Sequence, residues 1–224
     1  IVTSPGNRKR LSLDSKFDPE SIFSDVGSNP NFKDCINAVE FCQKNMFDGV
    51  IALGGGSAMD LAKVVMAHLS VEKKDINELI EYTGKFSQSI PSIFLPTTHG
   101  TASEVTMWGT LWNMEEEKKY SISHPSLYPS VAILDGNLTL TLPLDISIST
   151  VMDALSHSFE SIWNKKANHT STDFAITAIC SILENGPALK ENPDDLDTRN
   201  NLLKAATVAG LAFSNTTTAA AHSM

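Results

Sequence analysis

The chain has 224 residues, 42% of them hydrophobic, and so can bury a sizeable core in one large domain or two modest ones. Its formal charge of -9, from 17 Lys and Arg against 26 Asp and Glu, leaves no basic stripe for a phosphate backbone, and nucleic acid is not an expected partner. Because no apolar run approaches the roughly 20 residues of a membrane span and no signal peptide opens the chain, we expect a soluble cytoplasmic protein without membrane contact.

The first two thirds of the chain alternate apolar strands with amphipathic helices. Strands are predicted at residues 1–4, 49–57, 91–98 and 130–135, and helices at residues 32–45 and 58–70. This alternation predicts an α/β domain with a parallel sheet covered by helices. Residues 11–34 have weak periodicity and many turn formers, so they predict no crossover helix. Cys35 and Cys42 would share one helix face as core thiols, and with Cys180 they fit no metal spacing, which suits a reducing cytoplasm.

The last third of the chain is predicted to be all-helical. The helical segments are residues 148–164, 171–183 and 195–213, the second ending at the Gly and Pro of "ENGP". We therefore expect an α/β domain over residues 1–147 and a helical domain over residues 148–224. The chain opens without Met and closes without a helix stop, so it is predicted to be truncated at both ends and its helical domain to be incomplete.

Gly54, Gly55 and Gly56, in "GGGSAMDLAK", stand between a predicted strand and a predicted helix. Such a loop lets the backbone approach a ligand, and the N–H groups at the helix start can bind a pyrophosphate. The stretch matches neither G-x-G-x-x-G, which requires Gly or Ala where Met59 stands, nor the Gly-Lys-Ser/Thr of a P-loop. The alternative is a tight strand-to-helix turn with Ser57 as the N-cap.

A second loop, "PTTHGTASEVT" at residues 96–106, follows another apolar strand and is rich in hydroxyl groups. Those hydroxyls, which suit a nucleotide, belong to Thr97, Thr98, Thr101 and Ser103. A Ser- and Thr-rich capping loop is the alternative.

Asp153 and His157, in "DALSHSFES", are four positions apart in a predicted helix, so both side chains can reach one cation. The alternative is a solvated surface pair. The opposite side of the helix is apolar and would be buried, leaving the pair facing a cleft between domains; it carries Val151, Leu155, Phe159 and Ile162. His222 is the next candidate ligand, with a terminal solvated His as its alternative. Three ligands of carboxylate and imidazole type suit Fe(II), Zn(II) or a similar ion.

Taken together, "GGGSAMDLAK", "TTHGTASEVT" and "DALSHSFES" resemble, in order and spacing, the iron-containing (group III) alcohol dehydrogenase family over nearly the whole chain. The sequences of residues 119–135 and of "ESIWN" are most similar to the branch that contains phosphonoacetaldehyde reductases. The resemblance implies a Rossmann-like domain followed by a helical domain, as in dehydroquinate synthase, and a homodimer or larger homo-oligomer.

Site residues also follow from the resemblance. It implies that Asp153, His157 and His222 bind the metal and that Ser57, Asp60 and Lys119 belong to the NAD(H) or NADP(H) site with the two loops. Ser4 stands where NAD-preferring relatives carry Asp, which favours tolerance of NADP(H). The family's fourth ligand, a His within P-H-G, is absent from the sequence, and Ala102 replaces a frequent Gly.

The implied reaction is hydride transfer between a nicotinamide and a small aldehyde or alcohol, with Fe(II) or Zn(II) as Lewis acid. Spacing alone does not identify the catalytic proton relay, and His99 could equally be a solvated loop residue. Two alternatives remain open: a nucleotide-binding module without turnover, and a lyase related to dehydroquinate synthase.

Overall fold

The computed structural model describes residues 1–45, 47–71, 76–82, 84, 86 and 88–217. Its contacts divide the chain into two compact units, the first formed by residues 1–95 and 107–132 and the second by residues 96–106 and 133–224. This division differs from the predicted domain boundary after residue 147, because the hydroxyl-rich loop and the segment that precedes the long helices cluster with those helices. No helix among the described residues is long and apolar enough to cross a membrane.

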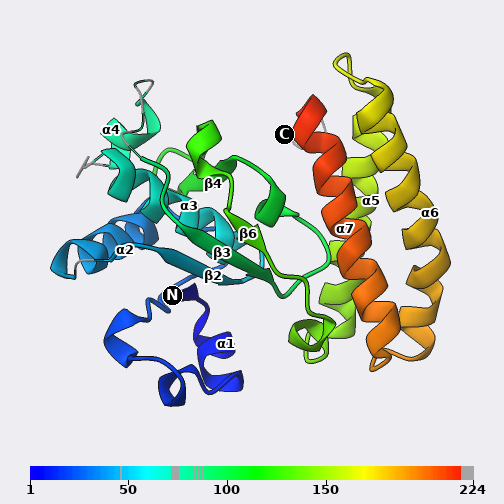
Figure 1. The fold of residues 1–224 in the computed structure, drawn as a ribbon, viewed down its shortest axis with the longest axis horizontal. Coiled ribbons are helices and arrows are strands. Elements are labelled where there is room, and N and C mark those ends of the chain that lie inside the picture. Colours follow the sequence, from blue (N-terminus) through cyan, green and yellow to red (C-terminus); the bar gives the residue numbers. More distant parts are fainter. Residues whose placement is uncertain (46, 72–75, 83, 85, 87, 218–224) are drawn as a thin grey trace. The chain divides into compact units, whose positions relative to one another are not determined.

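The first unit is built on a parallel sheet (Figure 1). Its strands are β1 (Val2–Thr3), β2 (Val50–Gly54), β3 (Ser92–Pro96) and β6 (Val131–Ala132), in the order β1-β2-β3-β6. Val2 pairs with Ala52 and Ile93 with Val131, both in parallel. Its α-helices are α1 (Pro5–Arg10), α2 (Phe32–Lys44), α3 (Gly56–Val71) and α4 (Ile76–Ile80). The 3₁₀ helix η4 (Pro125–Leu127) precedes β6. The predicted parallel sheet is therefore confirmed.

Helix α2 begins at a capping box in which Asn31 and Asp34 bond each other's backbone N–H groups. Cys35 and Cys42 lie on its buried face, where desolvation raises the pKa of the Cys35 thiol to about 12 and that of Cys42 to about 11. Both cysteines are thus core thiols, as predicted, and neither is an activated nucleophile. Cys180 is exposed and free.

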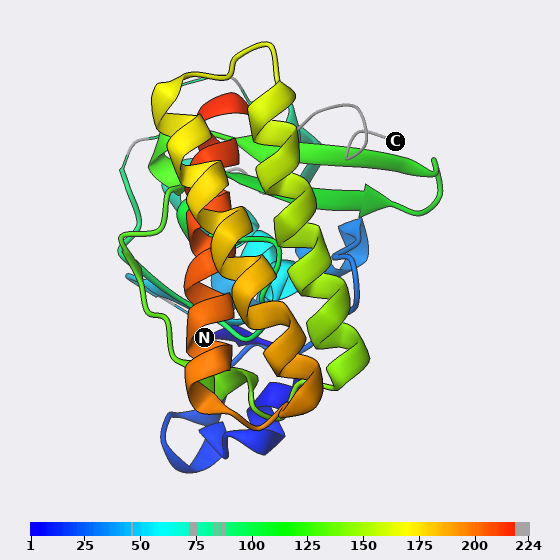
Figure 2. The same ribbon diagram turned by 90° about the vertical axis from the view of Figure 1, so that its right-hand side faces the viewer.

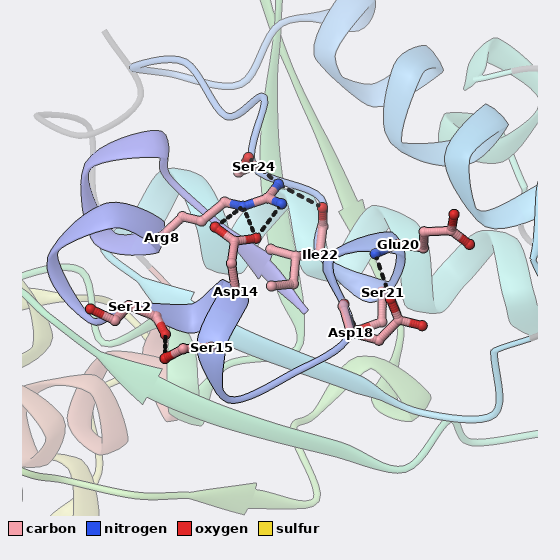
Figure 3. Close-up of polar contacts among 9 residues, drawn as sticks. All are labelled: Arg8, Ser12, Asp14, Ser15, Asp18, Glu20, Ser21, Ile22 and Ser24. Atoms are coloured by element: carbon pink, nitrogen blue, oxygen red, sulfur yellow. Dashed lines mark hydrogen bonds and ion pairs between the residues drawn. The ribbon is translucent and has the colours of Figure 1, made fainter.

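Residues 11–34 contain no α-helix before α2, in agreement with their weak periodicity, and fold into the 3₁₀ turns η1 (Leu13–Ser15) and η2 (Pro19–Ser21). Arg8 holds this segment against α1: its guanidinium donates to both carboxylate oxygens of Asp14, to the carbonyl of Ile22 and to the hydroxyl of Ser24 (Figure 3). The guanidinium lowers the pKa of the Asp14 carboxyl, because it donates hydrogen bonds to its charged form. An ion pair therefore holds in place a connection that contains no α-helix.

Helices α1 and α4 of the first unit were not predicted, nor was the antiparallel hairpin of β4 (Trp108–Asn113) and β5 (Lys118–Ser123). The side chain of Asn113 accepts from two backbone N–H groups of the turn, and Glu117 has a φ of 53°. Leu111 and Ile122 point into the core of the unit. The charged turn and the apolar alternation on both sides of it were the sequence signal for this hairpin.

The second unit holds three long helices, α5 (Leu144–Trp163), α6 (His169–Glu191) and α7 (Leu196–Thr216), which pack side by side (Figures 1 and 2). It also contains the 3₁₀ turns η3 (Ser103–Val105) and η5 (Gly136–Thr139). The predicted helical domain is confirmed, but the predicted stop at "ENGP" is wrong, because α6 continues through Pro187. Leu189 beyond that proline is 1% exposed in the core of the bundle, and this packing outweighs the lost backbone hydrogen bond.

Candidate functional site

The glycine loop lies at the carboxyl ends of β1 and β2 in the first unit. Gly54 ends β2, and a Cβ at this position would lie 2.6 Å from the Cβ of Ala58, so only glycine allows α3 to start this close to the strand. Helix α3 begins at Gly56, which places Ser57 inside the first turn and makes the N-cap role considered for it wrong. The first N–H groups of a helix lack partners within it, so the start of α3 suits an anionic group.

Ser4 lies beside this loop, because it follows Thr3, whose partner in the sheet is Leu53, the residue before Gly54. Its hydroxyl caps α1 by accepting the N–H of Asn7 at 3.2 Å. The starts of α1 and α3 are thus next to each other at one edge of the sheet, where parallel α/β sheets bind nucleotides.

Ser57 and Asp60 use their side chains to hold neighbouring segments. The Ser57 hydroxyl accepts the N–H of Asn29 at 3.1 Å, and an Asp60 carboxylate oxygen accepts the N–H of Thr110 in β4 at 3.0 Å. Lys63, fully buried one turn further along α3, donates to the carbonyl of Trp108 at 2.7 Å. Helix α3 thereby fixes the hairpin that carries Lys119, whose exposed ammonium lies 5.8 Å from the ring centre of Trp112.

The hydroxyl-rich loop lies in the second unit, against α5. The backbone N–H of His99 is 3.4 Å from the hydroxyl of Thr150. A Cβ at Gly100 would lie 2.9 Å from the carbonyl oxygen of Thr150 and 3.0 Å from a carboxylate oxygen of Asp153. Of the predicted hydroxyl residues, Thr97 and Ser103 are buried, whereas Thr98 and Thr101 remain half-exposed. The structure therefore places the loop backbone directly beside the first predicted metal ligand.

Asp153 and His157 form the candidate metal centre on α5. Nε2 of His157 lies 3.9 Å from Oδ1 of Asp153, and the side chains are 7% and 33% exposed, respectively. Two ligands at about 2.0–2.2 Å from one cation lie about 3–4 Å apart, so this pair fits a shared divalent ion. The His157 ring stacks on Phe213 of α7 with ring centres 4.3 Å apart, which fixes its orientation.

No third His, Cys, Asp or Glu joins this pair among the residues that the structure describes. The predicted third ligand, His222, lies outside those residues. The opposite face of α5 is less buried than predicted: Val151 is 5% exposed, but Phe159 and Ile162 are 39% and 36% exposed. That expectation was wrong for the last turns of the helix, whose outer side extends beyond the core of the three helices.

His99 is completely buried, so its interpretation as a solvated loop residue is wrong. Neither ring nitrogen has a hydrogen-bond partner among the described residues. Desolvation, together with the nearby positive charge of Arg199, lowers the pKa of His99 to about 4. The sequence offered no signal for this burial, because the side chain belongs to a polar loop.

The buried imidazole makes stability depend on pH. The unfolded chain protonates His99 near pH 6.5 and the folded chain near pH 4, so the unfolded state binds more protons between these values. We expect the free energy of unfolding of the metal-free protein to fall by about 2–3 kcal/mol as the pH drops from 6.5 to 4 on this account. Urea unfolding of the wild type and of His99→Leu, measured at several pH values, checks this. The wild type should lose more free energy of unfolding than the variant between pH 6.5 and pH 4, and an equal loss in both proteins would contradict the expectation.

Comparison with known proteins gives consistent results for both units. Residues 6–136 match the family model described as iron-containing alcohol dehydrogenase, and residues 147–224 match the C-terminal model of the same family. Long-chain-alcohol dehydrogenase 1 from Geobacillus thermodenitrificans is 34% identical over 226 residues, a match that covers 100% of this chain and 55% of the relative.

Solved structures agree with this assignment. The sulfoacetaldehyde reductase from Bifidobacterium kashiwanohense, solved in complex with NAD+, is 32% identical with a TM-score of 0.87, covering 98% of this chain and 60% of that one. An iron-containing alcohol dehydrogenase from Thermotoga maritima is 30% identical with a TM-score of 0.86, covering 98% and 62%. The chain thus spans little more than half the length of these relatives, and it belongs to the iron-containing alcohol dehydrogenase family.

Proposed function

We propose that the protein interconverts a small aldehyde and its alcohol with NAD(H) or NADP(H), at a divalent metal held by Asp153, His157 and His222. One observation carries the proposal: within a single unit, Gly100 of the hydroxyl-rich loop lies against Asp153, one helical turn from His157. A loop suited to a nucleotide and a pair of ligands suited to a cation are therefore parts of one site. Fe(II) is the expected ion, and Zn(II) is the alternative.

The bound groups would supply hydride from the nicotinamide and Lewis-acid polarisation of the carbonyl oxygen. The chain's own residues would hold the cation and orient the cofactor. The carboxylate of Asp153 and Nε2 of His157 bind the cation, and the stack on Phe213 keeps the imidazole in place. The half-exposed hydroxyls of Thr98 and Thr101 and the start of α3 are the proposed cofactor contacts.

The experiment is an assay of the purified full-length protein. NADH or NADPH should be oxidised in the presence of short aldehydes, this activity should disappear after chelation, and Fe(II) should restore it. Nucleotide binding without aldehyde-dependent oxidation at full metal occupancy would favour the binding-module alternative. The matched relatives are named dehydrogenases and reductases, which gives the lyase alternative no support.

Ser4 provides a test of cofactor preference. We expect Ser4→Asp to shift the ratio of kcat/KM from NADPH toward NADH by about tenfold or more, because a carboxylate there would repel a 2′-phosphate and accept from ribose hydroxyls. Asp is also a good N-cap, so the cap of α1 is kept. Ser4→Ala is the control, since it removes the cap without adding charge. An unchanged ratio in Ser4→Asp would remove the argument from this position.

The remaining proposals rest on the resemblance and on the family: a homodimeric or larger assembly, a cytoplasmic location, and a substrate related to phosphonoacetaldehyde.

A further inference from the structure

Residues 102–105, which follow Gly100 in the loop, pack on α7 at Gly210. An ideal Cβ at Gly210 would lie 2.3 Å from the Cβ of Ala102 and 2.7 Å from Cγ2 of Val105. Real Cβ atoms do not approach other atoms this closely, so residues 102–105 can pack on α7 only where position 210 has no side chain. Ala102 has a φ of 49° and is 3% exposed, so its methyl group fills the space above Gly210 although the backbone conformation suits glycine better.

A hydrogen bond fixes the same segment one turn earlier on α7. The hydroxyl of Thr207 donates to Oε1 of Glu104 at 2.7 Å, and Glu104 is 3% exposed. Thr207 and Gly210 are three positions apart, so they lie on one face of the helix. Together they form the surface of α7 on which η3 packs.

The other side of the loop lies against α5. Gly100 contacts Thr150 and Asp153 so closely that an added carbon would be 2.9–3.0 Å from their atoms. Helices α5 and α7 pack on each other in the same unit. If residues 102–105 were displaced from α7, Gly100 would therefore move against Thr150 and the carboxylate of Asp153, because it already lies in close contact with both.

We infer that Gly210, supported by Thr207, is a positioning residue that sets the place of the Asp153 carboxylate through the loop and thereby tunes metal affinity. This inference rests on the proposed function, because it requires Asp153 to bind the metal. Gly210 itself acts only by allowing Ala102 to approach α7.

The test measures the dissociation constant of Zn(II), by competition with a chromophoric chelator, in the purified full-length protein. Gly210→Ala should weaken Zn(II) binding by about 10- to 100-fold, the loss typical of disturbing a group that orients a ligand. The double variant Ala102→Gly with Gly210→Ala should recover part of the affinity, because the 2.3 Å conflict with Ala102 is removed and only the 2.7 Å approach to the end of the Val105 side chain remains. Gly186→Ala is the control: the same change in α6, a helix of the same unit, meets nothing within 4 Å and should leave the affinity unchanged.

Wild-type affinity in a folded Gly210→Ala protein would overturn the inference, and so would a double variant as weak as the single one. If Gly210→Ala does not fold, Thr207→Val removes the hydrogen bond to Glu104 without adding bulk, and wild-type affinity in that variant would overturn it equally. A wild-type protein that binds no Zn(II) would refute the proposed function and this inference with it. If only this inference is wrong, the wild type still binds Zn(II). The two failures are therefore distinguishable.

Discussion

Replacing His157 by alanine is expected to remove the metal from the full-length protein and to lower aldehyde reduction by more than about 100-fold, since even a partner that only orients a ligand is worth 10- to 100-fold. The imidazole is one of two side chains on α5 whose atoms, 3.9 Å apart, converge on one position. The ring is buried and stacked on Phe213, so its replacement by a methyl group removes the nitrogen ligand from a position that packing has fixed. Metal content per chain and kcat/KM, measured on the same sample, check this expectation.

His169→Ala is the matched control for that experiment. His169 is an exposed imidazole at the start of α6, in the same unit, and its loss should change neither metal content nor activity. Activity that survives in His157→Ala with full metal occupancy would refute the role of His157 as a ligand.

Arg199→Leu is expected to lower the free energy of unfolding by roughly 3–5 kcal/mol, because a buried charged donor is lost and its carbonyl partners are left without it. Arg199 is 1% exposed. Its guanidinium donates to the carbonyl oxygens of Pro193, Thr139 and Leu142 and to the hydroxyl of Ser147. These bonds join the start of α7 to η5 and to the first turns of α5, just before Thr150 and Asp153.

Urea unfolding of metal-free protein measures this loss. Lys204→Leu makes a similar change at an exposed cation on the same helix and should stay within about 0.5 kcal/mol of the wild type. A similar small effect in both variants would show that Arg199 does not hold the helical unit together.

The sequence predicted those parts of the fold that depend on neighbouring residues. The strand, glycine loop and helix at residues 50–71 were recognisable because apolar runs and glycines act locally. The continuation of α6 through Pro187 was not, because it depends on packing of Leu189 against other helices. Helix α1 was also missed, since six residues with three basic side chains show no apolar face.

The candidate site shows the same division. The four-residue spacing of Asp153 and His157 is a local property of a helix and was visible in the sequence. The contact of the loop with α5 joins residues such as His99 and Thr150, which are 51 positions apart, and no spacing rule predicts it. The burial of His99 and the contact of Ala102 with Gly210 follow from that long-range packing, so they became visible only in the structure.

A crystal structure of the full-length protein with its metal, with anomalous diffraction measured at the iron edge, would show whether Asp153 and His157 bind one ion. We expect one anomalous peak within about 2.3 Å of a carboxylate oxygen of Asp153 and of Nε2 of His157, with Gly100 still packed against that carboxylate. A metal held elsewhere, or a peak at this place with His157 turned away from it, would show that Asp153 and His157 are not the metal ligands.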